Sequence, residues 1–280
     1  MLLPPSFLDC VVAIGIRQET GQKAWIASGF LIGELVESVD EKRKLYSTYL
    51  ATNRHVFEGQ KEAWVRFNPR DTQPAREYLL GLEDRDGKRI WQPHSDPTID
   101  VAVVPINVGI LRQEGMQFDY FRSDEHVADR KRLVDLGLGE GDFVYVLGFP
   151  MGLIGGERNF VIVRQGVIAR IRDALVGAGN EYVLDAFIFP GNSGGPVVTK
   201  PELISIIGTK VISSSILIGM VKAYVPYRDV AISTQTGQPR VIFEENSGLA
   251  AIIPIDFVRE PIQRHMESEK KRKQGNITPS

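Results

Sequence analysis

Short apolar runs separated by turn residues dominate the hydrophobic pattern of the chain. In the first half these runs are β-branched or alternate with period two, at Val11–Ile16, Ala24–Ile32, Leu45–Thr52, Ala63–Phe67 and Asp100–Ile106. In the second half the pattern returns at Phe143–Gly148, Phe160–Ile171, Glu181–Phe189, Ile216–Val225 and Ala250–Ile255. Runs of this length, bounded by Gly, Pro, Asn and Asp, predict β-strands.

The segment between the two groups, Gln113–Arg132, is charged and polar and predicts a crossover between two folding units. The last segment predicts a helix with Asp256 as its N-cap and Pro261 in its first turns. The pattern therefore predicts an all-β fold of two barrels or sandwiches with a C-terminal helix. We expect the first unit, the crossover, the second unit and the helix with its frayed tail at residues 1–115, 116–135, 136–255 and 256–280.

Composition and charge exclude several classes of protein. The chain has 280 residues, of which 43% are hydrophobic, so it can bury a substantial core. The net charge of −2 gives no indication of a nucleic-acid groove or a membrane surface, and we expect neither partner. No apolar stretch is long enough to span a membrane, and the N-terminal run ends at Pro4 and Pro5 with no basic start, unlike a signal peptide.

The single cysteine, Cys10, excludes an intramolecular disulfide and a cysteine-rich zinc site. We expect it to be a small buried hydrophobic residue beside Val11 and Val12. Together with the absence of a signal peptide, this predicts a reducing, cytoplasmic location.

The sharpest motif is Phe189–Pro196, in which three glycines surround Ser193. Glycines allow the backbone to turn tightly, so that the hydroxyl is exposed and nearby N–H groups converge. Acyl transfer needs a nucleophile of this kind and backbone donors for the developing oxyanion. The motif therefore predicts a nucleophile, although it also fits a glycine-rich turn that happens to contain serine.

A serine nucleophile needs a base, and the chain has four histidines. His55 follows the predicted strand Leu45–Thr52 directly and is the candidate base, although a histidine in this place is more often structural. We interpret the other three as solvated surface residues: His94, His126 and His265.

Asp100 begins an apolar strand pattern, where it can orient the base or simply cap the strand. The chain order His55, Asp100, Ser193 is that of chymotrypsin-class triads. This order places the base and the carboxylate in the first unit and the nucleophile in the second. We therefore expect a site at the junction of the two units.

Further blocks extend the pattern over most of the chain, from about Val11 to Val258. They are Ser28–Phe30, Thr52–Val56, Asp100–Val104, Gly141–Phe143, Gly148–Leu153, Gln165–Ile168, Asp185–Pro196 and Gly248–Pro254. In order and content these blocks resemble trypsin-fold serine peptidases and are most similar to the HtrA/Deg protease domain. The resemblance implies two six-stranded antiparallel β-barrels and a serine endopeptidase that acts on protein or peptide substrates, with no metal or cofactor. It leaves the oligomeric state open.

The resemblance also implies a role for each site residue. His55 is the general base and then the general acid, Asp100 holds its tautomer, and Ser193 forms the acyl-enzyme. The backbone N–H groups of Gly191 and Ser193 form the oxyanion hole. Asn192 stands where digestive-type relatives have an aspartate that pairs with a new N-terminal amine, so we expect no such activation. We expect no PDZ domain after the second unit, so the partner sensing linked to that domain is not implied.

The substrate pocket is predicted from the segment before the serine. Phe187–Phe189 contains no carboxylate, which predicts a small or medium apolar residue, rather than Lys or Arg, before the scissile bond. We expect the strand Gly219–Tyr224 to pair with the substrate, with Val211–Ile216 as the alternative. The predicted substrate-binding residues are Phe187, Met220, Val221 and Lys222.

Two other functions fit parts of the sequence. A catalytically silent pseudo-protease would bind peptide in the same cleft, although an intact triad argues against it. An α/β-hydrolase would use Ser193 with Asp229 or Asp256 and then His265, because Gly191–Gly195 fits G-x-S-x-G. That class needs a helix after the serine, whereas Pro196–Thr199 predicts a strand.

Overall fold

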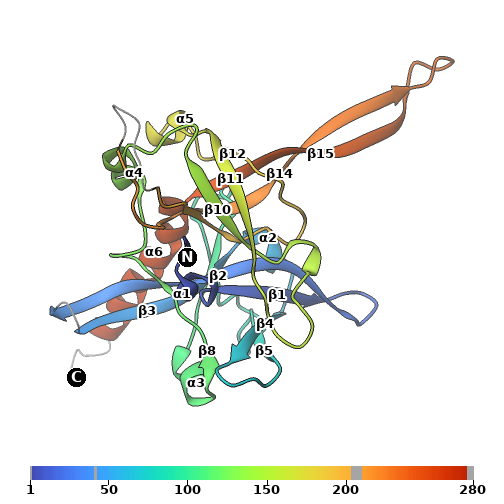
Figure 1. Ribbon diagram of the computed structural model, residues 1–280. Helices are drawn as coiled ribbons and strands as arrows, with labels where there is room; N and C mark the ends of the chain where they lie inside the picture. Colours follow the sequence, from blue (N-terminus) through green and yellow to red (C-terminus); the bar gives the residue numbers. More distant parts are fainter. Residues whose placement is uncertain (1, 41–42, 203–209, 276–280) are drawn as a thin grey trace.

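The computed structural model describes residues 2–40, 43–202 and 210–275. Two β-rich units lie one above the other, with the C-terminal helix α6 (Ile255–Gly275) packed against both (Figure 1). The strands of the first unit are β1 (Val11–Arg17), β2 (Lys23–Asp40), β3 (Arg43–Thr52), β4 (Glu62–Pro69), β5 (Arg76–Gly81), β6 (Gln92–Pro93), β7 (Ala102–Pro105), β8 (Met116–Gln117) and β9 (Phe121–Arg122). Those of the second are β10 (Phe143–Gly148), β11 (Ile162–Arg170), β12 (Tyr182–Asp185), β13 (Pro196–Thr199), β14 (Leu217–Ile232) and β15 (Pro239–Pro254).

The second unit is the closed six-stranded antiparallel barrel that the sequence predicts. Its strands follow the order β10-β11-β12-β15-β14-β13 among the described residues. The apolar runs that predict these strands lie inside the barrel, where Val144, Val146, Leu184, Val197 and Ile252 are fully buried. Alternation along each strand thus places one face in the core and the other toward solvent.

The first unit differs from the predicted six-stranded barrel. Within the described chain it is a curled nine-stranded sheet in the order β5-β4-β1-β2-β3-β7-β6, with β8 on β4 and β9 on β2, and it does not close. The two ends of this order are β5 and β6, which the described chain joins only through an isolated bridge between Glu83 and Arg89. β6 has two residues, one of them Pro93, which has no backbone N–H to donate, so it is too short to pair with β5 and close the sheet. After β7 the Asn107 side chain accepts a hydrogen bond from Gly109 N at 3.0 Å and caps α3 (Val108–Gln113). Residues of β5 and α3 line a cavity of about 150 Å³.

The described helices other than α6 are short, α3 included. The others are α1 (Pro5–Leu8), α2 (Arg54–Phe57), α4 (Arg130–Leu136), η1 (Pro150–Gly152) and α5 (Arg172–Leu175). The long C-terminal helix confirms the sequence prediction. The predicted N-cap is wrong, because the helix begins at Ile255 and Asp256 lies in its first turn. The Asp256 side chain instead accepts hydrogen bonds from the N–H of Arg130, the first residue of α4. No described helix has the length and apolar character needed to cross a membrane.

A third apolar cluster joins the two units. In it Phe30 and Phe121 of the first unit pack with Phe149 of the second and Val258 of α6, all at most 1% exposed. Cys10 belongs to the same cluster at 1% exposure, which confirms that it is a buried hydrophobic residue. Because this cluster fills the junction, the two units form one body and a site between them is held in place.

Two β-hairpins project beyond the body in opposite directions (Figure 1). One is formed by β2 and β3, and the other by β14 and β15. The sequence predicted strands at Ile216–Val225 and Ala250–Ile255, whereas the structure continues β14 to Ile232 and begins β15 at Pro239. We call the projecting part of the second hairpin, residues 225–247, the arm.

Candidate active site

His55 and Asp100 lie together because two neighbouring strands end at the same place. Thr52, at the end of β3, pairs with Ala102, at the start of β7. The chain enters α2 directly after β3, which places His55 beside Asp100, just before β7. His55 Nδ1 lies 2.7 Å from Asp100 Oδ2, and His55 N donates to Asp100 Oδ1 at 3.0 Å.

The electrostatics of this pair favour an ionised carboxylate. Burial raises the pKa of Asp100, but the hydrogen bonds from the side chain and backbone of His55 and the attraction of His55 and Lys222 outweigh it. The pKa therefore lies below its ordinary value of 3.8. An ionised Asp100 accepts the Nδ1 proton, so Nε2 of the neutral imidazole is left as a proton acceptor. The imidazole is 53% exposed and can reach a substrate.

Backbone hydrogen bonds from both units fix the loop that carries Ser193. Ser28 N, on β2, donates to Ser193 O at 2.9 Å. On the other side Gly194 N donates to Val221 O, and Val221 N donates to Gly195 O, both at 2.9 Å. Ser193 is thus held between β2 and β14 and is half-buried. In the described part of the chain its hydroxyl makes no hydrogen bond with His55.

Two backbone N–H groups beside the serine are free to bind an anion. Pro190 O accepts a hydrogen bond from Met151 N at 2.6 Å, so Gly191 N–H points to the opposite side of that peptide plane. Asn192 O accepts from Gly195 N at 2.8 Å, which turns Ser193 N–H away in the same manner. Neither N–H has an acceptor among the described residues. The predicted oxyanion donors are therefore unengaged and held in fixed peptide planes.

Glycine is required at two positions of this loop. Gly191 and Gly194 have φ values of +99° and +81°, which side chains disfavour. A Cβ at Gly191 would also overlap Phe149 O, and one at Gly194 would overlap Ser28 O and Thr52 Oγ1. The close approach of Gly194 to Thr52 brings the serine loop against the end of β3, which leads directly to His55.

Ser28 is a positioning residue that sequence reasoning did not assign. Its side chain is fully buried, donates to Gly191 O at 2.7 Å and accepts from Phe149 N at 2.9 Å. It therefore ties β2 of the first unit to two loops of the second. The only signal for it in the sequence was the block Ser28–Phe30, which carries no indication of these contacts.

Asn192 is fully buried and directly precedes Ser193. Its Oδ1 accepts a hydrogen bond from Phe189 N at 3.1 Å, which closes the turn before the serine. Its Nδ2 has no partner among the described residues. The side chain at this buried position is thus a neutral amide, and none of its described contacts is a charged group that could pair with a carboxylate.

The predicted substrate-binding residues differ in accessibility. Phe187 is 56% exposed, whereas the side chains of Met220 and Val221 are fully buried and can offer only their backbone. Lys222 Nζ binds Glu181 Oε1 at 2.5 Å, and both side chains are about one-third exposed. The alternative strand Val211–Ile216 is wrong, because the chain becomes a strand only at Leu217. The role of these residues in binding stays a prediction.

The interpretation of the remaining histidines as solvated is wrong. His94 is only 9% exposed, and its Nδ1 accepts a hydrogen bond from Asp96 N at 3.0 Å. His265 Nδ1 lies 3.0 Å from Tyr49 Oη, and burial lowers the pKa of its imidazole. Single hydrogen bonds of this kind leave no periodic pattern in the sequence, so burial of these histidines could not be predicted.

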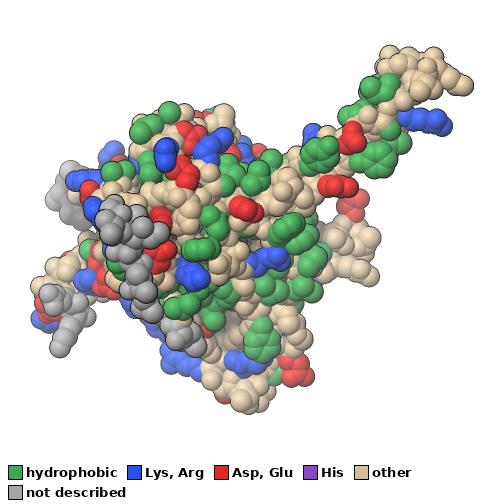
Figure 2. Space-filling model, turned by 45° about the horizontal axis from the view of Figure 1, so that its top comes forward, with side chains coloured by type: hydrophobic (Ala, Val, Ile, Leu, Met, Phe, Trp, Pro, Cys, Tyr) green, Lys and Arg blue, Asp and Glu red, His purple; other side chains and the backbone are tan. Residues whose placement is uncertain are grey.

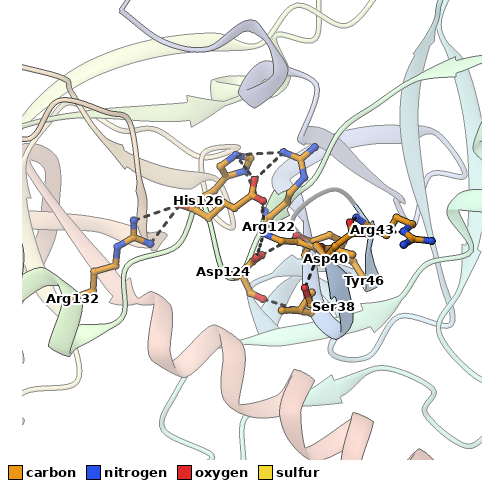
Figure 3. Close-up of polar contacts among 12 residues, drawn as sticks. Ser38, Asp40, Arg43, Tyr46, Arg122, Asp124, His126 and Arg132 are labelled. Carbon is orange, nitrogen blue, oxygen red and sulfur yellow. Dashed lines mark hydrogen bonds and ion pairs between the residues drawn. The ribbon is translucent and has the colours of Figure 1, made fainter.

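His126 belongs to a polar cluster beside the β2–β3 hairpin (Figure 3). Its Nδ1 accepts from Arg122 N at 3.2 Å, and nearby Tyr46 Oη donates to Asp124 at 2.9 Å. Burial and the charge of Arg122 lower the pKa of His126. The cluster connects the hairpin to the segment that joins the units.

The structure also decides against the α/β-hydrolase arrangement. Pro196–Thr199, after the serine, forms strand β13 and not a helix. Asp229 lies on the arm, and His265 is engaged by Tyr49. Among the described residues no group of three or more His, Cys, Asp or Glu side chains is placed to hold a metal ion.

Comparison with known proteins places these observations in context. The family model described as "Trypsin-like peptidase domain" matches residues 27–203. A curated relative, the "Probable periplasmic serine endoprotease DegP-like" of Chlamydia pneumoniae, is 27% identical over 169 residues, which are 60% of this chain and only 27% of that protein. A similar solved structure is the apo MamO protease domain of Magnetospirillum magneticum, with 16% identity, a TM-score of 0.47, and coverage of 93% of this chain and 97% of the other.

Proposed function

Because the chain belongs to the trypsin-like peptidase family, we propose that it is a serine endopeptidase that uses Ser193, His55 and Asp100. The observation that carries this proposal is the His55–Asp100 hydrogen bond of 2.7 Å at the edge of the loop that holds Ser193. The unengaged N–H groups of Gly191 and Ser193 add the donors that acyl transfer requires.

In this proposal each group has one task. His55 Nε2 takes the proton from Ser193 Oγ as the oxygen attacks the substrate carbonyl. The N–H groups of Gly191 and Ser193 stabilise the resulting oxyanion, and Asp100 stabilises the imidazolium. The protonated His55 then gives its proton to the leaving amine. In the second half of the reaction His55 takes a proton from water as the water attacks the acyl-enzyme, and it returns that proton to Ser193 Oγ as the ester bond breaks.

A peptide-binding protein without catalysis is the second candidate. It is favoured by one observation, that Ser193 makes no hydrogen bond with His55 in the described structure. Such bonds are often long in free enzymes and tighten when the substrate binds, so the peptidase is the better supported function.

Labelling with a fluorophosphonate probe separates the two candidates. A peptidase is labelled on Ser193, and both Ser193→Ala and His55→Ala lose the label, because the probe reacts only with an activated serine. The unactivated side chain of Ser38, exposed on the β2–β3 hairpin, serves as an internal control for non-specific reaction. Equal labelling of wild type and Ser193→Ala, or none in either, would overturn the proposal.

We also propose an apolar preference for the residue before the scissile bond. The exposed Phe187 ring lies near Gly248, and the segment Phe187–Phe189 before the serine contains no carboxylate. Peptide reporters with Val, Ala or Leu at that position should be cleaved at least about tenfold faster, in kcat/KM, than reporters with Lys or Arg. Faster cleavage of the basic reporters would contradict the preference.

A further inference from the structure

The arm carries two strands whose outer edges have no partner. β14 and β15 remain paired to the end of the arm, with Pro226 opposite Asn246 and Ile232 opposite Pro239. Within the described residues the other neighbour of β14, β13, stops pairing at Met220, and the other neighbour of β15, β12, starts pairing only at Leu249. The arm is therefore a two-stranded ribbon that leaves the body with both edges open (Figure 1).

The free edge of β14 begins directly beside the nucleophile. Val221 exchanges backbone hydrogen bonds with Gly194 and Gly195, the two residues after Ser193. From Lys222 onward no described strand pairs with that side of β14. A polypeptide whose reacting carbonyl lies at Ser193 therefore meets the start of an open strand edge that continues into the arm.

Both faces of the arm carry exposed apolar side chains. Val230 and Ile242 form a cross-strand pair on one face and are 42% and 63% exposed. Phe243, opposite Asp229 on the other face, is 54% exposed, and Tyr227 is 59% exposed. Figure 2 shows hydrophobic side chains along the surface of the arm. An isolated two-stranded ribbon is only marginally stable in water, and exposed apolar patches mark interaction surfaces.

The base of the arm is held in place by side chains. Glu244 accepts hydrogen bonds from Tyr224 Oη at 2.9 Å and from Arg228 Nε at 3.0 Å. These contacts join the two strands at the point where the ribbon leaves the barrel. Pro226 removes one backbone donor from β14, so pairing along this edge relies on the residues to either side of it.

We propose that the arm binds the part of an extended protein substrate that precedes the scissile bond. That segment adds a third strand to the free edge of β14 and packs its apolar side chains against the exposed β14 side chains of Tyr227 and Val230. β14 runs away from Ser193, so a segment that ends at Ser193 pairs antiparallel, which is the more stable arrangement. The inference rests on the proposed peptidase function and names its substrate class: unfolded or extended polypeptide with apolar residues well before the cleaved bond.

Binding of fluorescein-labelled casein to the Ser193→Ala protein, followed by fluorescence anisotropy, tests the arm without requiring catalysis. In one variant an Asn-Gly turn replaces residues 228–244, and in another Val230→Glu places a charge on β14 beside the bound segment. Each should weaken binding by about tenfold or more. The matched control is Leu45→Glu on the other hairpin, where Leu45 is 59% exposed, and it should stay within about twofold of Ser193→Ala. Unchanged binding in both arm variants overturns the proposal.

Two further measurements separate this proposal from its alternatives. Fluorophosphonate labelling of the shortened-arm protein should match wild type, because the arm does not form the reactive serine. If wild type itself is not labelled, the peptidase proposal is refuted, whereas casein binding still decides the role of the arm. Sedimentation velocity reports whether the arm instead binds a second copy of the chain. A dimer that dissociates when the arm is shortened, with casein binding unchanged, overturns the substrate proposal.

Discussion

Asp100 and Asn192 show how single residues set the chemistry of the site. Asp100 is held ionised by His55 despite its burial, with a pKa below the ordinary value. Asn192 is fully buried with a neutral amide and an unpartnered Nδ2. The candidate site therefore keeps one negative charge, hydrogen-bonded to His55, and none at the residue before Ser193.

Asn192→Asp should destabilise the protein in a pH-dependent manner. A carboxylate at this buried position has no counter-ion among the described contacts of Asn192, so its ionised form is expected to cost about 3 kcal/mol of unfolding free energy at pH 7. Burial raises the pKa of such a carboxyl, so the loss should shrink as the pH falls and the group becomes protonated. Urea unfolding at pH 7 and pH 5 measures both effects, and a variant as stable as wild type at pH 7 contradicts this expectation.

Asp100→Asn should reveal the stabilising contribution of the ionised carboxylate. Because the pKa of Asp100 is lowered in the folded protein, its contribution is complete above the unfolded value of 3.8 and is lost as the pH falls below it. The stability difference between wild type and Asp100→Asn should therefore be constant at neutral pH and decrease below about pH 4. Chemical unfolding from pH 7 to pH 3 checks this, and a difference that grows toward acid pH would falsify the stated pKa direction.

The serine loop is an element whose conformation depends on glycine and on contacts with the other unit. Gly194 fits against Ser28 and Thr52 with a positive φ, and Ser28 donates to Gly191 O. The loop can therefore present the nucleophile only while β2 lies against it. This makes the loop sensitive to any added side chain.

Gly194→Ala should abolish labelling of Ser193 and lower stability more than a matched variant. Gly87 has a φ of +74° and open space where a Cβ would lie, so Gly87→Ala carries only the backbone strain, about 1 kcal/mol. Gly194→Ala adds steric overlap and should cost at least about 3 kcal/mol. Thermal unfolding and fluorophosphonate labelling compare the two, and equal effects would show that the tight fit is unimportant.

The sequence predicts some elements better than others. The runs that contain Val144, Leu184 and Ile252 predict their strands because each buries one face in a closed barrel. The arm was missed because its residues face solvent on both sides and therefore show no apolar alternation. The open sheet was missed because β6, at its edge, has only two residues and contains Pro93, and so short a strand leaves no alternating pattern in the sequence.

The whole molecule brings the site together from two units. The shared apolar cluster around Phe30 and Phe149 fixes the junction, and the Ser28–Ser193 backbone bond crosses it. The order of His55, Asp100 and Ser193 in the sequence predicted this placement. The contacts of Ser28 could not be predicted, because hydrogen bonds between residues distant in the chain leave no local pattern.

At this scale the assembled site should form an acyl-enzyme on Ser193. The most direct test mixes the protein with a nitrophenyl ester of an N-blocked apolar amino acid and follows nitrophenol release together with intact and peptide mass. We expect an initial burst that scales with the enzyme concentration and an acyl adduct on Ser193, both absent in Ser193→Ala. Release without a burst, or an adduct that persists in Ser193→Ala, would contradict acylation of this serine.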